Sequence, residues 1–488
     1  MENITKQSPI TLIELPPTLF GEFNGKIARD VFSLFKLPGR AIHTLESILV
    51  NERYKDVLSI NPLYHGDGGK LTEENKKRIF ESPILGISSI TRTAPQSMEF
   101  AKIYKLKNPE GIIIAGGADP TFRIKEWLDV VDIVVCGEGE ITLPKLIERL
   151  GEDRKELGDI KGIAYQKNGN IEVTEPREFL TGEQLSQIHP IYDPITMAGV
   201  GNPVVETTRG CPYSCDYCSV TSFYGRKHRH KSNNFVTDEI KNIFNMGMDG
   251  LIFFIDDNFA ANPQRTIDLC NAIEGSGLNT RRGSAQVTVK TAENEELLDA
   301  LLRAGIKRLY VGFESINNET LTNMRKPFTA EQNTNAAQKF KKWGFWIHGM
   351  MIVGADGDTP ETLRETSSWA NKYLDSVQLF SQVPLPGTDY HDNMVEQKRI
   401  LTNDYSLYDG NHVVVRPENF TPLELQLTIN NMFKSFYSKV NCFTRWRNTE
   451  HKKTARDIMI YLHLMGGIKK TLYDPQSKQH MDFLKSVG

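Results

Sequence analysis

The sequence predicts an α/β protein made of two successive series of alternating strands and helices, followed by a helical region. In the first series, short apolar segments lie at residues 57–60, 84–90, 111–115 and 132–136, with helical stretches between them. In the second series, from about residue 203 to 383, six such segments alternate with helices. We therefore expect five regions: an N-terminal extension (1–54), a Rossmann-like domain (55–150), a hairpin and connector (151–200), a partial (β/α)6 barrel of the TIM type (201–395) and a helical C-terminal region (396–488).

The composition is that of a globular protein without a strong charge bias. Its 488 residues are 39% hydrophobic, and 58 Lys and Arg stand against 61 Asp and Glu, which gives a net charge of −3. This balance argues against a dedicated nucleic-acid-binding protein. No apolar run reaches the roughly 18 residues that a membrane-spanning helix needs, and the first residues lack the basic start and apolar core of a signal peptide. We therefore expect a cytoplasmic protein.

The first series predicts a parallel, doubly wound sheet, because short runs rich in Ile and Val alternate with helices. After it, the segments GIAYQ and IEVTE flank the turn sequence Lys167-Asn168-Gly169-Asn170. An Asn-Gly pair between two such segments is typical of a β-hairpin. Residues 176–200 contain scattered Pro and Gly and predict a connector.

The second series predicts six strands, at residues 204–207, 251–255, 285–289, 308–313, 346–353 and 377–383. Helix boundary signals lie between them. One helix begins at Thr329, with Gln332 at the spacing of a capping box, and ends at Gly344. Another begins at Thr359-Pro360, an N-cap followed by proline. Six strands joined by helices fit a partial TIM-type barrel, whose functional residues lie at the C-terminal ends of the strands.

The C-terminal region carries a basic, aromatic stretch. Residues 434–470 hold nine Lys or Arg against Glu450 and Asp457, with aromatic residues between them. Such a stretch can contact anionic lipid headgroups. A helix over 423–437, however, has an apolar pattern that suits packing on the barrel. We expect packing rather than membrane contact.

Three of the six cysteines, Cys211, Cys215 and Cys218, fall within eight residues just after the first barrel strand. The C-x3-C-x2-C spacing places three thiolates on one tight loop, where they can ligate three irons of a 4Fe–4S cluster. The fourth iron is then open to a small molecule that presents an amine and a carboxylate. A zinc site with His228 or His230 as fourth ligand is the alternative, but it would not explain why the triplet lies at the mouth of a barrel strand.

The triplet, with Tyr217 just before its last cysteine, resembles the signature of the radical S-adenosylmethionine (SAM) superfamily over residues 201–395. The resemblance implies that SAM binds the open iron and that one electron, from a donor such as flavodoxin or ferredoxin, cleaves it to a 5′-deoxyadenosyl radical. This radical abstracts hydrogen from carbon. Such a cluster is degraded by oxygen, so we expect function under anaerobic conditions.

The resemblance also implies SAM contacts at the other strand ends. Asp256-Asp257-Asn258 stands where related enzymes often carry Gly-Gly-Glu for the SAM amino group, so the carboxylates are expected to accept the same hydrogen bonds. A purely structural role, such as a capping Asp, a paired Glu or a turn Gly, is the alternative at each position. The expected SAM-binding residues are Tyr217, Asp256, Asp257, Gln286, Glu314, Ser315, Ile352 and Gly354.

The Rossmann-like domain carries Ser88-Ser89-Ile90-Thr91 in its second strand, Gly116-Gly117 after its third and Cys136-Gly137-Glu138 at the end of its fourth, and with these it resembles cobalamin-binding domains. Small residues at its strand ends would let a large planar corrin and its nucleotide tail approach the backbone. The expected cobalamin-binding residues are Ser88, Ser89, Thr91, Gly116, Gly117, Gly137 and Glu138. The family's Asp-x-His-x-x-Gly motif is incomplete, because Leu63 replaces the Asp that would orient His65. His65 is a candidate cobalt ligand, with an ordinary loop histidine as the alternative.

The whole chain resembles the cobalamin-dependent class B methylases of this superfamily. That resemblance implies methyl transfer from methylcobalamin to an unactivated carbon of a small-molecule or lipid-like substrate, with SAM as both radical source and methyl donor. Two alternatives remain. An enzyme of the same architecture can cyclise, rearrange or couple its substrate without net methylation, and a non-enzymatic sensor can hold cobalamin or a metal beside a structural cluster.

Overall fold

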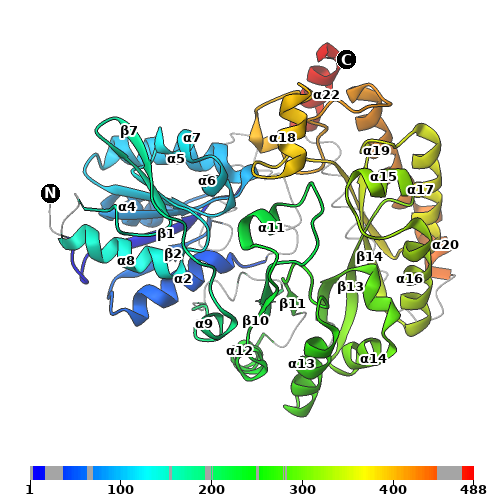
Figure 1. Cartoon of the computed structure of the whole chain (residues 1–488), viewed down its shortest axis with the longest axis horizontal. Coiled ribbons are helices and arrows are strands. Elements are labelled where there is room, and N and C mark those ends of the chain that lie inside the picture. The colour runs from blue at the N-terminus through cyan, green and yellow to red at the C-terminus, as the bar shows by residue number, and fades with distance from the viewer. Residues whose placement is uncertain are drawn as a thin grey trace.

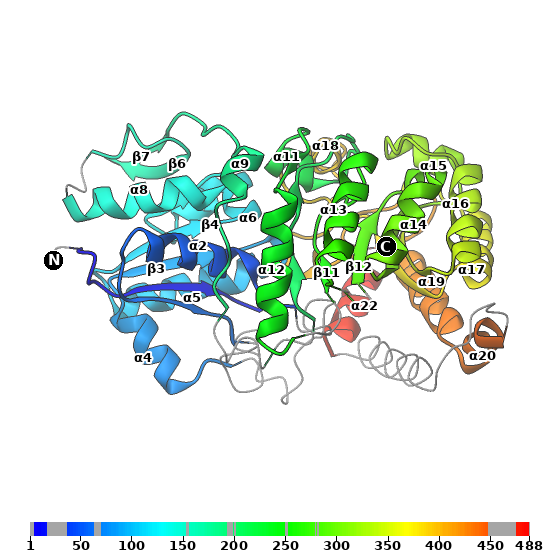
Figure 2. The same ribbon diagram turned by 90° about the horizontal axis from the view of Figure 1, so that it is seen from below.

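The computed structural model describes residues 4–16, 37–62, 70–152, 156–192, 202–248, 252–278 and 283–447, the helix over 475–487, and the single residues 199 and 280. It contains two α/β units side by side. The N-terminal unit runs from blue to cyan in Figure 1 and the barrel from green to yellow, and helix α11 (Ser219–Tyr224) lies between them. Figure 2 shows the same two units from below.

The N-terminal unit is a seven-stranded sheet in the order β2-β1-β3-β4-β5-β6-β7. Five strands are parallel: β1 (Ile10–Glu14), β2 (Val57–Ile60), β3 (Ile84–Ser88), β4 (Ile112–Gly116) and β5 (Ile133–Val135). Helices α2 (Arg40–Asn51) and α8 (Gly139–Glu152) contribute to the core on one face. The core on the other face includes residues of α4 (Glu73–Glu81), α5 (Ala94–Lys107) and α7 (Ile124–Leu128), and the short helices η1 (Thr91–Thr93) and α6 (Ala118–Phe122) follow β3 and β4. The expected doubly wound, Rossmann-like arrangement is confirmed.

Strand β1 lies inside this sheet, which we did not expect. Ile10 pairs with Val57 of β2 on one side and with Ile84 of β3 on the other. The sheet therefore begins before residue 55, and residues 1–54 are not merely an extension to it. The sequence signal for β1 is weak because it is one short apolar segment whose partners are more than forty residues away in the chain.

The expected hairpin forms the end of the sheet. Strands β6 (Ile163–Lys167) and β7 (Asn170–Val173) are antiparallel, and β6 pairs in the same sense with β5. The turn residues Asn168 and Gly169 have φ of 53° and 79°, which suits the two left-handed positions of an Asn-Gly hairpin turn. The connector that follows contains the short helix α9 (Gly182–Leu185).

The second unit is a six-stranded parallel sheet in the order β15-β14-β13-β12-β11-β8, as expected for a partial barrel. Its strands are β8 (Val204–Val205), β11 (Phe253–Phe254), β12 (Gly283–Val287), β13 (Ile306–Glu314), β14 (Trp346–Val353) and β15 (Ser376–Ser381). Its helices after α11 are α12 (Asn233–Asn245), α13 (Pro263–Gly275), η2 (Val289–Glu293), α14 (Glu295–Arg303), α15 (Asn318–Asn323), α16 (Ala330–Trp343) and α17 (Pro360–Tyr373). A small antiparallel pair, β9 (Thr208–Arg209) with β10 (Arg229–His230), precedes and follows the cysteine loop.

Burial alternates along the central barrel strands. Outward residues such as Val311 and Ile347 are fully buried in the core shared with the helices. The alternate residues Tyr310, His348 and Gln378, on the inner face, are only partly buried. In a closed TIM barrel the inward side chains fill the interior. Here the inner face stays partly exposed, which leaves it open to a ligand.

The C-terminal region is mostly helical and packs on the barrel. It comprises α18 (Asp389–Glu396), η3 (Tyr405–Leu407), α19 (Pro422–Phe436), α20 (Lys439–Arg447) and α22 (Pro475–Val487). Leu425, Ile429 and Phe436 of α19 belong to the barrel core, which confirms the expected packing of this helix. Most of the basic stretch, from residue 448 to 470, lies outside the described residues. None of the described helices is long and apolar enough to cross a membrane.

Candidate active site

The three cysteines lie on the loop between β9 and α11, and Cys218 is the residue before α11. All three are free and partly exposed, and the N–H of Cys218 donates to the carbonyl of Cys215 at 3.3 Å. Burial raises the pKa of each thiol, and the charge of Cys215 raises the pKa of both Cys211 and Cys218 further. The loop thus gathers three thiols within electrostatic range of each other, which fits a cluster whose irons each take one cysteine.

The zinc alternative would need His228 or His230 beside the three cysteines. Among the described residues, no three His, Cys, Asp or Glu side chains converge closely enough to hold one metal ion. His228 and His230, which were the candidate fourth ligands, instead pack edge to face with ring centroids 4.6 Å apart.

Asp256 and Asp257 follow β11 and have different surroundings. Asp256 is 1% exposed, and its Oδ1 accepts hydrogen bonds from the N–H of Thr207 at 3.0 Å and from the hydroxyls of Thr207 and Thr208 at 3.0 and 2.5 Å. These bonds tie the end of β11 to the segment that leads into the cysteine loop. Its Oδ2 is buried and has no hydrogen-bond partner among the residues that the structure describes.

Asp257 lies next to the cysteine loop. Burial raises its pKa to about 7, with Asp256 and Glu206 contributing. Its charge in turn raises the pKa of Cys211 and Cys218. Gln286 donates to its backbone carbonyl at 3.2 Å. A carboxylate with a raised pKa beside the cluster thiols is suited to accept hydrogen bonds from a cationic or amine ligand, because such a partner would stabilise its charged form.

Tyr217 of the cysteine loop forms a largely buried polar group with Glu314 and Lys326. Lys326 Nζ lies 2.8 Å from Glu314 Oε1, and the Tyr217 hydroxyl hydrogen-bonds the same carboxylate. Burial alone would lower the pKa of Lys326, but Glu314 and Cys215 raise it. Glu314 has a positive φ of 62°. Such backbone strain in a non-glycine residue is often found at functional sites.

The remaining residues expected to contact SAM differ in how far other residues of the protein already engage them. Ile352 packs with Tyr217 in a small apolar cluster, which offers a surface for a flat ring. Ser315 is 2% exposed, its hydroxyl accepts from the N–H of Asn317, and its carbonyl accepts from Asn333. Gly354 has φ of +81°, its N–H donates to Asp358, and a side chain there would collide with Leu425 of α19. Ser315 and Gly354 are thus engaged in the turns after their strands, and their contact with SAM stays a prediction.

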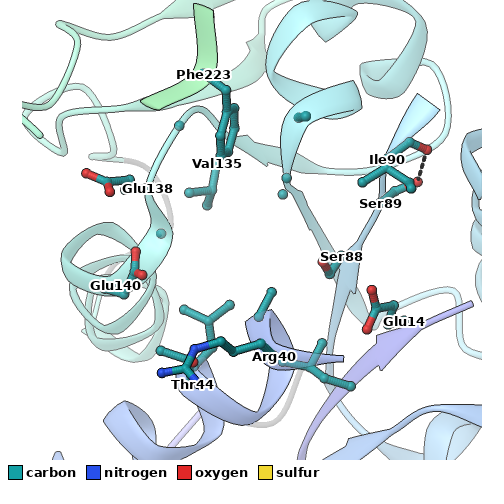
Figure 3. A pocket seen from close by; sticks show the side chains of 18 of the residues that line it. Glu14, Arg40, Thr44, Ser88, Ser89, Ile90, Val135, Glu138, Glu140 and Phe223 are labelled. Carbon is teal, nitrogen blue, oxygen red and sulfur yellow. Dashed lines mark hydrogen bonds between the residues drawn. The ribbon is translucent and has the colours of Figure 1, made fainter. Parts of the chain in front are cut away.

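A cavity of about 360 Å³ lies at the C-terminal edge of the N-terminal sheet. It is within the roughly 300–1,000 Å³ of small-molecule pockets. Figure 3 shows Ser88, Ser89, Val135, Glu138 and Phe223 around it. Six of the seven residues expected to bind cobalamin line it: Ser88, Ser89, Gly116, Gly117, Gly137 and Glu138. The seventh, Thr91, hydrogen-bonds the buried Asp119 instead.

The lining suits a large ligand that lies against the backbone. Gly117 has φ of +103°, and a Cβ there would come within 2.5 Å of the Ser89 carbonyl. A Cβ at Gly137 would meet nothing within 4 Å. Glu138 lines the cavity, but its carboxylate already binds two arginines and the N–H of Leu180. His65 lies outside the described residues, so its proposed role stays a prediction.

The opposite wall of the cavity comes from the barrel unit. Ser219, Val220, Phe223 and Tyr224 of α11 line it, together with Arg209, Glu206 and Ile255. Helix α11 begins directly after Cys218. The same short helix therefore lines the cavity and directly follows the cysteine loop.

Sequence reasoning missed the charged residues that join the two units, and it missed Lys326. Arg209 binds both Glu138 of the N-terminal unit and Glu206 of the barrel. The available signal was the charge of Glu206 and Arg209 within a short, otherwise uncharged β segment, Val204 to Arg209. Lys326 stands in a loop after α15, and its local sequence has no feature that distinguishes it from a solvated lysine.

Comparison with known proteins agrees with these features. The family model of the radical SAM superfamily matches residues 205–370. An uncharacterized methyltransferase of Pyrococcus horikoshii is 30% identical over 73% of this chain and 79% of its own length. An anaerobic magnesium-protoporphyrin IX monomethyl ester cyclase of Cereibacter sphaeroides is 26% identical over 85% of this chain and 70% of its own length.

Among solved structures, the cobalamin-dependent SAM radical enzyme OxsB with aqua-cobalamin and SAM bound superposes with a TM-score of 0.65 and 18% identity, over 98% of this chain and 83% of that one. This likeness shows that the two proteins share a fold. The cysteine loop, the barrel, the family match over residues 205–370 and the 30% identical relative all agree, and the chain belongs to the radical SAM superfamily.

Proposed function

We propose that this protein is a cobalamin-dependent radical SAM methylase that acts on an unactivated carbon of a small-molecule or lipid-like substrate. The observation that carries the proposal is the position of α11, which lines the cavity expected to hold cobalamin and begins directly after the last cluster cysteine. The two reagents that such a reaction requires would therefore lie on either side of one short helix. The methyltransferase and OxsB comparisons support the proposal.

When bound, the cluster and SAM supply the radical and cobalamin supplies the transferable methyl group. The residues of this chain would hold them. Cys211, Cys215 and Cys218 would ligate the cluster, and Asp257 would accept hydrogen bonds from the SAM amine. The apolar contact of Tyr217 with Ile352 would receive the adenine.

The inner face of the barrel would hold the substrate. Its partly exposed residues include Tyr310, His348, Met350, Gln378 and Phe380. Tyr310 and His348 contact each other, with ring centroids 4.6 Å apart, and His348 Nδ1 lies 2.8 Å from the Ser376 hydroxyl. Burial lowers the pKa of His348 to about 4, so this imidazole is neutral at physiological pH. The side chains at these positions are aromatic, apolar or neutral and polar, which favours an uncharged substrate moiety.

The proposed setting is the reducing cytoplasm under low oxygen, with flavodoxin or ferredoxin as electron donor. All six cysteines are free in the structure, which agrees with a reducing compartment. Contact with a membrane remains a minor alternative, linked to the basic stretch.

A second candidate function is cyclisation or rearrangement without net methylation. The relationship to the Cereibacter sphaeroides cyclase, which covers 85% of this chain, favours it. Both functions use the same cluster and barrel, so the fold does not separate them.

The deciding experiment uses the full chain, reconstituted anaerobically with iron, sulfide and hydroxocobalamin and reduced in the presence of SAM labelled in its methyl group. Cell extract supplies the unknown substrate. We expect 5′-deoxyadenosine together with a labelled product. SAM cleavage with an unlabelled, altered product would favour the cyclase-type function, and no SAM cleavage would refute both.

A further inference from the structure

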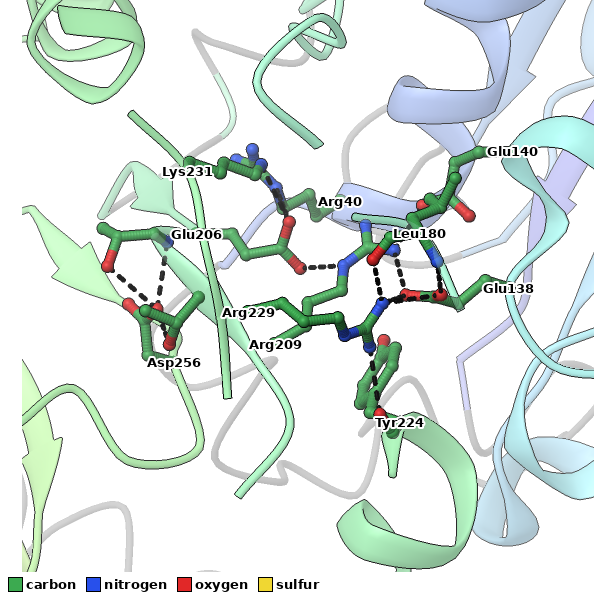
Figure 4. Close-up of polar contacts among 12 residues, drawn as sticks. Arg40, Glu138, Glu140, Leu180, Glu206, Arg209, Tyr224, Arg229, Lys231 and Asp256 are labelled. Carbon is green, nitrogen blue, oxygen red and sulfur yellow. Dashed lines mark hydrogen bonds and ion pairs between the residues drawn. The ribbon is translucent and has the colours of Figure 1, made fainter. Parts of the chain in front are cut away.

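Eight charged side chains form one buried network of ion pairs where the two units meet, and Figure 4 labels all of them except Glu239. All eight residues are at most 9% exposed. Four are acidic and four are basic, so the network is neutral as a whole: Glu138, Glu140, Glu206, Glu239, Arg40, Arg209, Arg229 and Lys231.

Arg209 is the centre of this network. Its guanidinium lies 3.0 Å from Glu138, in the loop after β5, 2.6 Å from Glu140, in the first turn of α8, and 2.8 Å from Glu206 of its own unit. Burial alone would raise the pKa of Glu206, but Arg209, Lys231 and Arg40 hold it well below its ordinary value. The Glu206 carboxylate is therefore charged, and its pairs with these three side chains are ionic.

Arg229 forms the second bridge. Its Nη1 lies 2.8 Å from both carboxylate oxygens of Glu138, and it also donates to the carbonyl of Leu180 in the connector. Its Nη2 donates to the carbonyl of Tyr224, the last residue of α11, at 3.0 Å. Glu138 is thereby linked to the end of α11 through one side chain.

The cysteine loop is consequently held at both ends. Arg209 precedes Cys211 by two residues, and Arg229 holds the end of the helix that follows Cys218. Both arginines are fixed by Glu138, which also lines the cavity. A ligand in the cavity would contact α11 and the Glu138 loop directly.

A buried network of this kind specifies one arrangement of its parts rather than adding stability, and removal of a single partner leaves an unpaired buried charge. We infer that the network couples occupancy of the cavity to the geometry of the cysteine loop, with Arg209 and Arg229 as positioning residues. The inference rests on the proposed function, because cavity and loop are the sites of cobalamin and of the cluster with SAM. Binding of one ligand would then change the affinity for the other, by the same factor in each direction.

The test measures the factor by which each ligand changes the affinity for the other. It uses cluster-bearing full-length protein with the cluster oxidised, so that SAM is not cleaved. Hydroxocobalamin is titrated with and without saturating SAM, and SAM is titrated with and without hydroxocobalamin. We expect the wild type to show a factor of about 5 or more, the lower end of typical allosteric couplings. Arg229→Gln should still bind each ligand but show a factor below about 2.

Two further variants keep the test decisive. Glu138→Gln/Arg229→Gln removes one charge of each sign, so it restores neutrality, and it should melt closer to the wild type while the factor stays below about 2. Arg92→Gln is the matched control. It breaks the 3.7 Å contact with Asp409, another link between the N-terminal unit and the rest of the chain, and should keep the wild-type factor.

The possible outcomes distinguish the proposed function from the proposed coupling. Absence of hydroxocobalamin binding by the wild type would overturn the proposed function. Binding of both ligands with a factor of one in the wild type, or a wild-type factor in both Arg229 variants, would overturn the coupling alone. Equal loss in Arg92→Gln would show that any break between the units suffices, and would equally overturn the role assigned to Arg209 and Arg229.

Discussion

Asp256 and Asp257 are neighbours in the sequence, but the structure predicts opposite consequences for their removal. Asp256 accepts three hydrogen bonds through one oxygen, from Thr207 and Thr208. Asp257 lies beside the cluster thiols, with a raised pKa. We expect Asp256→Ala to destabilise the barrel, and Asp257→Ala to weaken SAM binding with little change in stability.

The loss of stability expected for Asp256→Ala follows from the hydrogen bonds that Asp256 accepts. A buried donor left without an acceptor costs about 1–3 kcal/mol. Three donors therefore give a loss of at least about 3 kcal/mol, since water cannot readily reach a site that is 1% exposed. For a domain of this size each kcal/mol lowers the melting temperature by about 2–4 °C, so the barrel transition should fall by roughly 6–12 °C.

For Asp257→Ala, the expected effect is on the affinity for SAM. A hydrogen bond to a charged group contributes about 1.5–3 kcal/mol, so Asp257→Ala should raise the Kd for SAM by roughly 10- to 100-fold. With a pKa of about 7, the carboxylate is mostly protonated at low pH and loses its charge as pH falls. The wild-type affinity should therefore drop by about tenfold from pH 8 to pH 6. Asp257→Asn should lack this part of the pH dependence. Any pH dependence that comes from titration of SAM itself should be the same in both proteins.

The assays are anaerobic thermal denaturation and equilibrium SAM binding on reconstituted protein. Asp268→Ala, on the exposed side of α13, is the control for loss of a carboxylate and should change neither readout. Equal destabilisation by Asp256→Ala and Asp257→Ala, or a Kd for SAM that Asp257→Ala leaves unchanged, would refute the division of roles.

Three other expectations follow from the site. Replacing Cys211, Cys215 or Cys218 by Ala should remove cluster absorbance and SAM cleavage together, and normal iron content in the triple variant would contradict the assignment. Gly117→Ala should weaken hydroxocobalamin binding because its Cβ meets the Ser89 carbonyl, whereas Gly137→Ala, also at positive φ but without that clash, should bind closer to normally. Burial lowers the pKa of His348 from 6.5 to about 4, so its contribution to stability is present above pH 6.5 and is lost as pH falls towards 4, by about 3 kcal/mol in total. His348→Gln should flatten that part of the pH–stability curve in urea titrations, and an unchanged curve would argue against a buried neutral imidazole.

Local spacing explains why much of the fold and the cluster loop could be predicted. The cysteine triplet, the capping box at Thr329 and the Asn168-Gly169 turn each depend on residues a few positions apart, and the structure places the capping box and the turn as expected. The six barrel strands were detectable because each is an apolar segment between helices with clear boundaries.

Features that depend on distant partners were not predictable. Strand β1 acquires its role from β2 and β3, and Glu138 acquires its partners Arg209 and Arg229 from another unit, 71 and 91 positions away. The different roles of Asp256 and Asp257 have the same origin. Which carboxylate meets Thr207 and which meets the thiols depends on side-chain direction at the end of β11, and the sequence pattern Asp-Asp does not contain that information.

The position of the proposed site follows from topology. Ligands of parallel α/β sheets bind beyond the C-terminal ends of the strands, in the open sheet and in the barrel alike. Two such sheets in one chain can cooperate only if these edges face each other. Here the ends of β3 and β4 meet α11, which directly follows the cysteine loop after β8 and β9, across one cavity. Because α11 is only six residues long and begins directly after Cys218, a shift of the N-terminal unit would displace the cysteine loop. Fixing that unit by buried ion pairs on both sides of the loop would therefore serve the proposed chemistry as well as the fold.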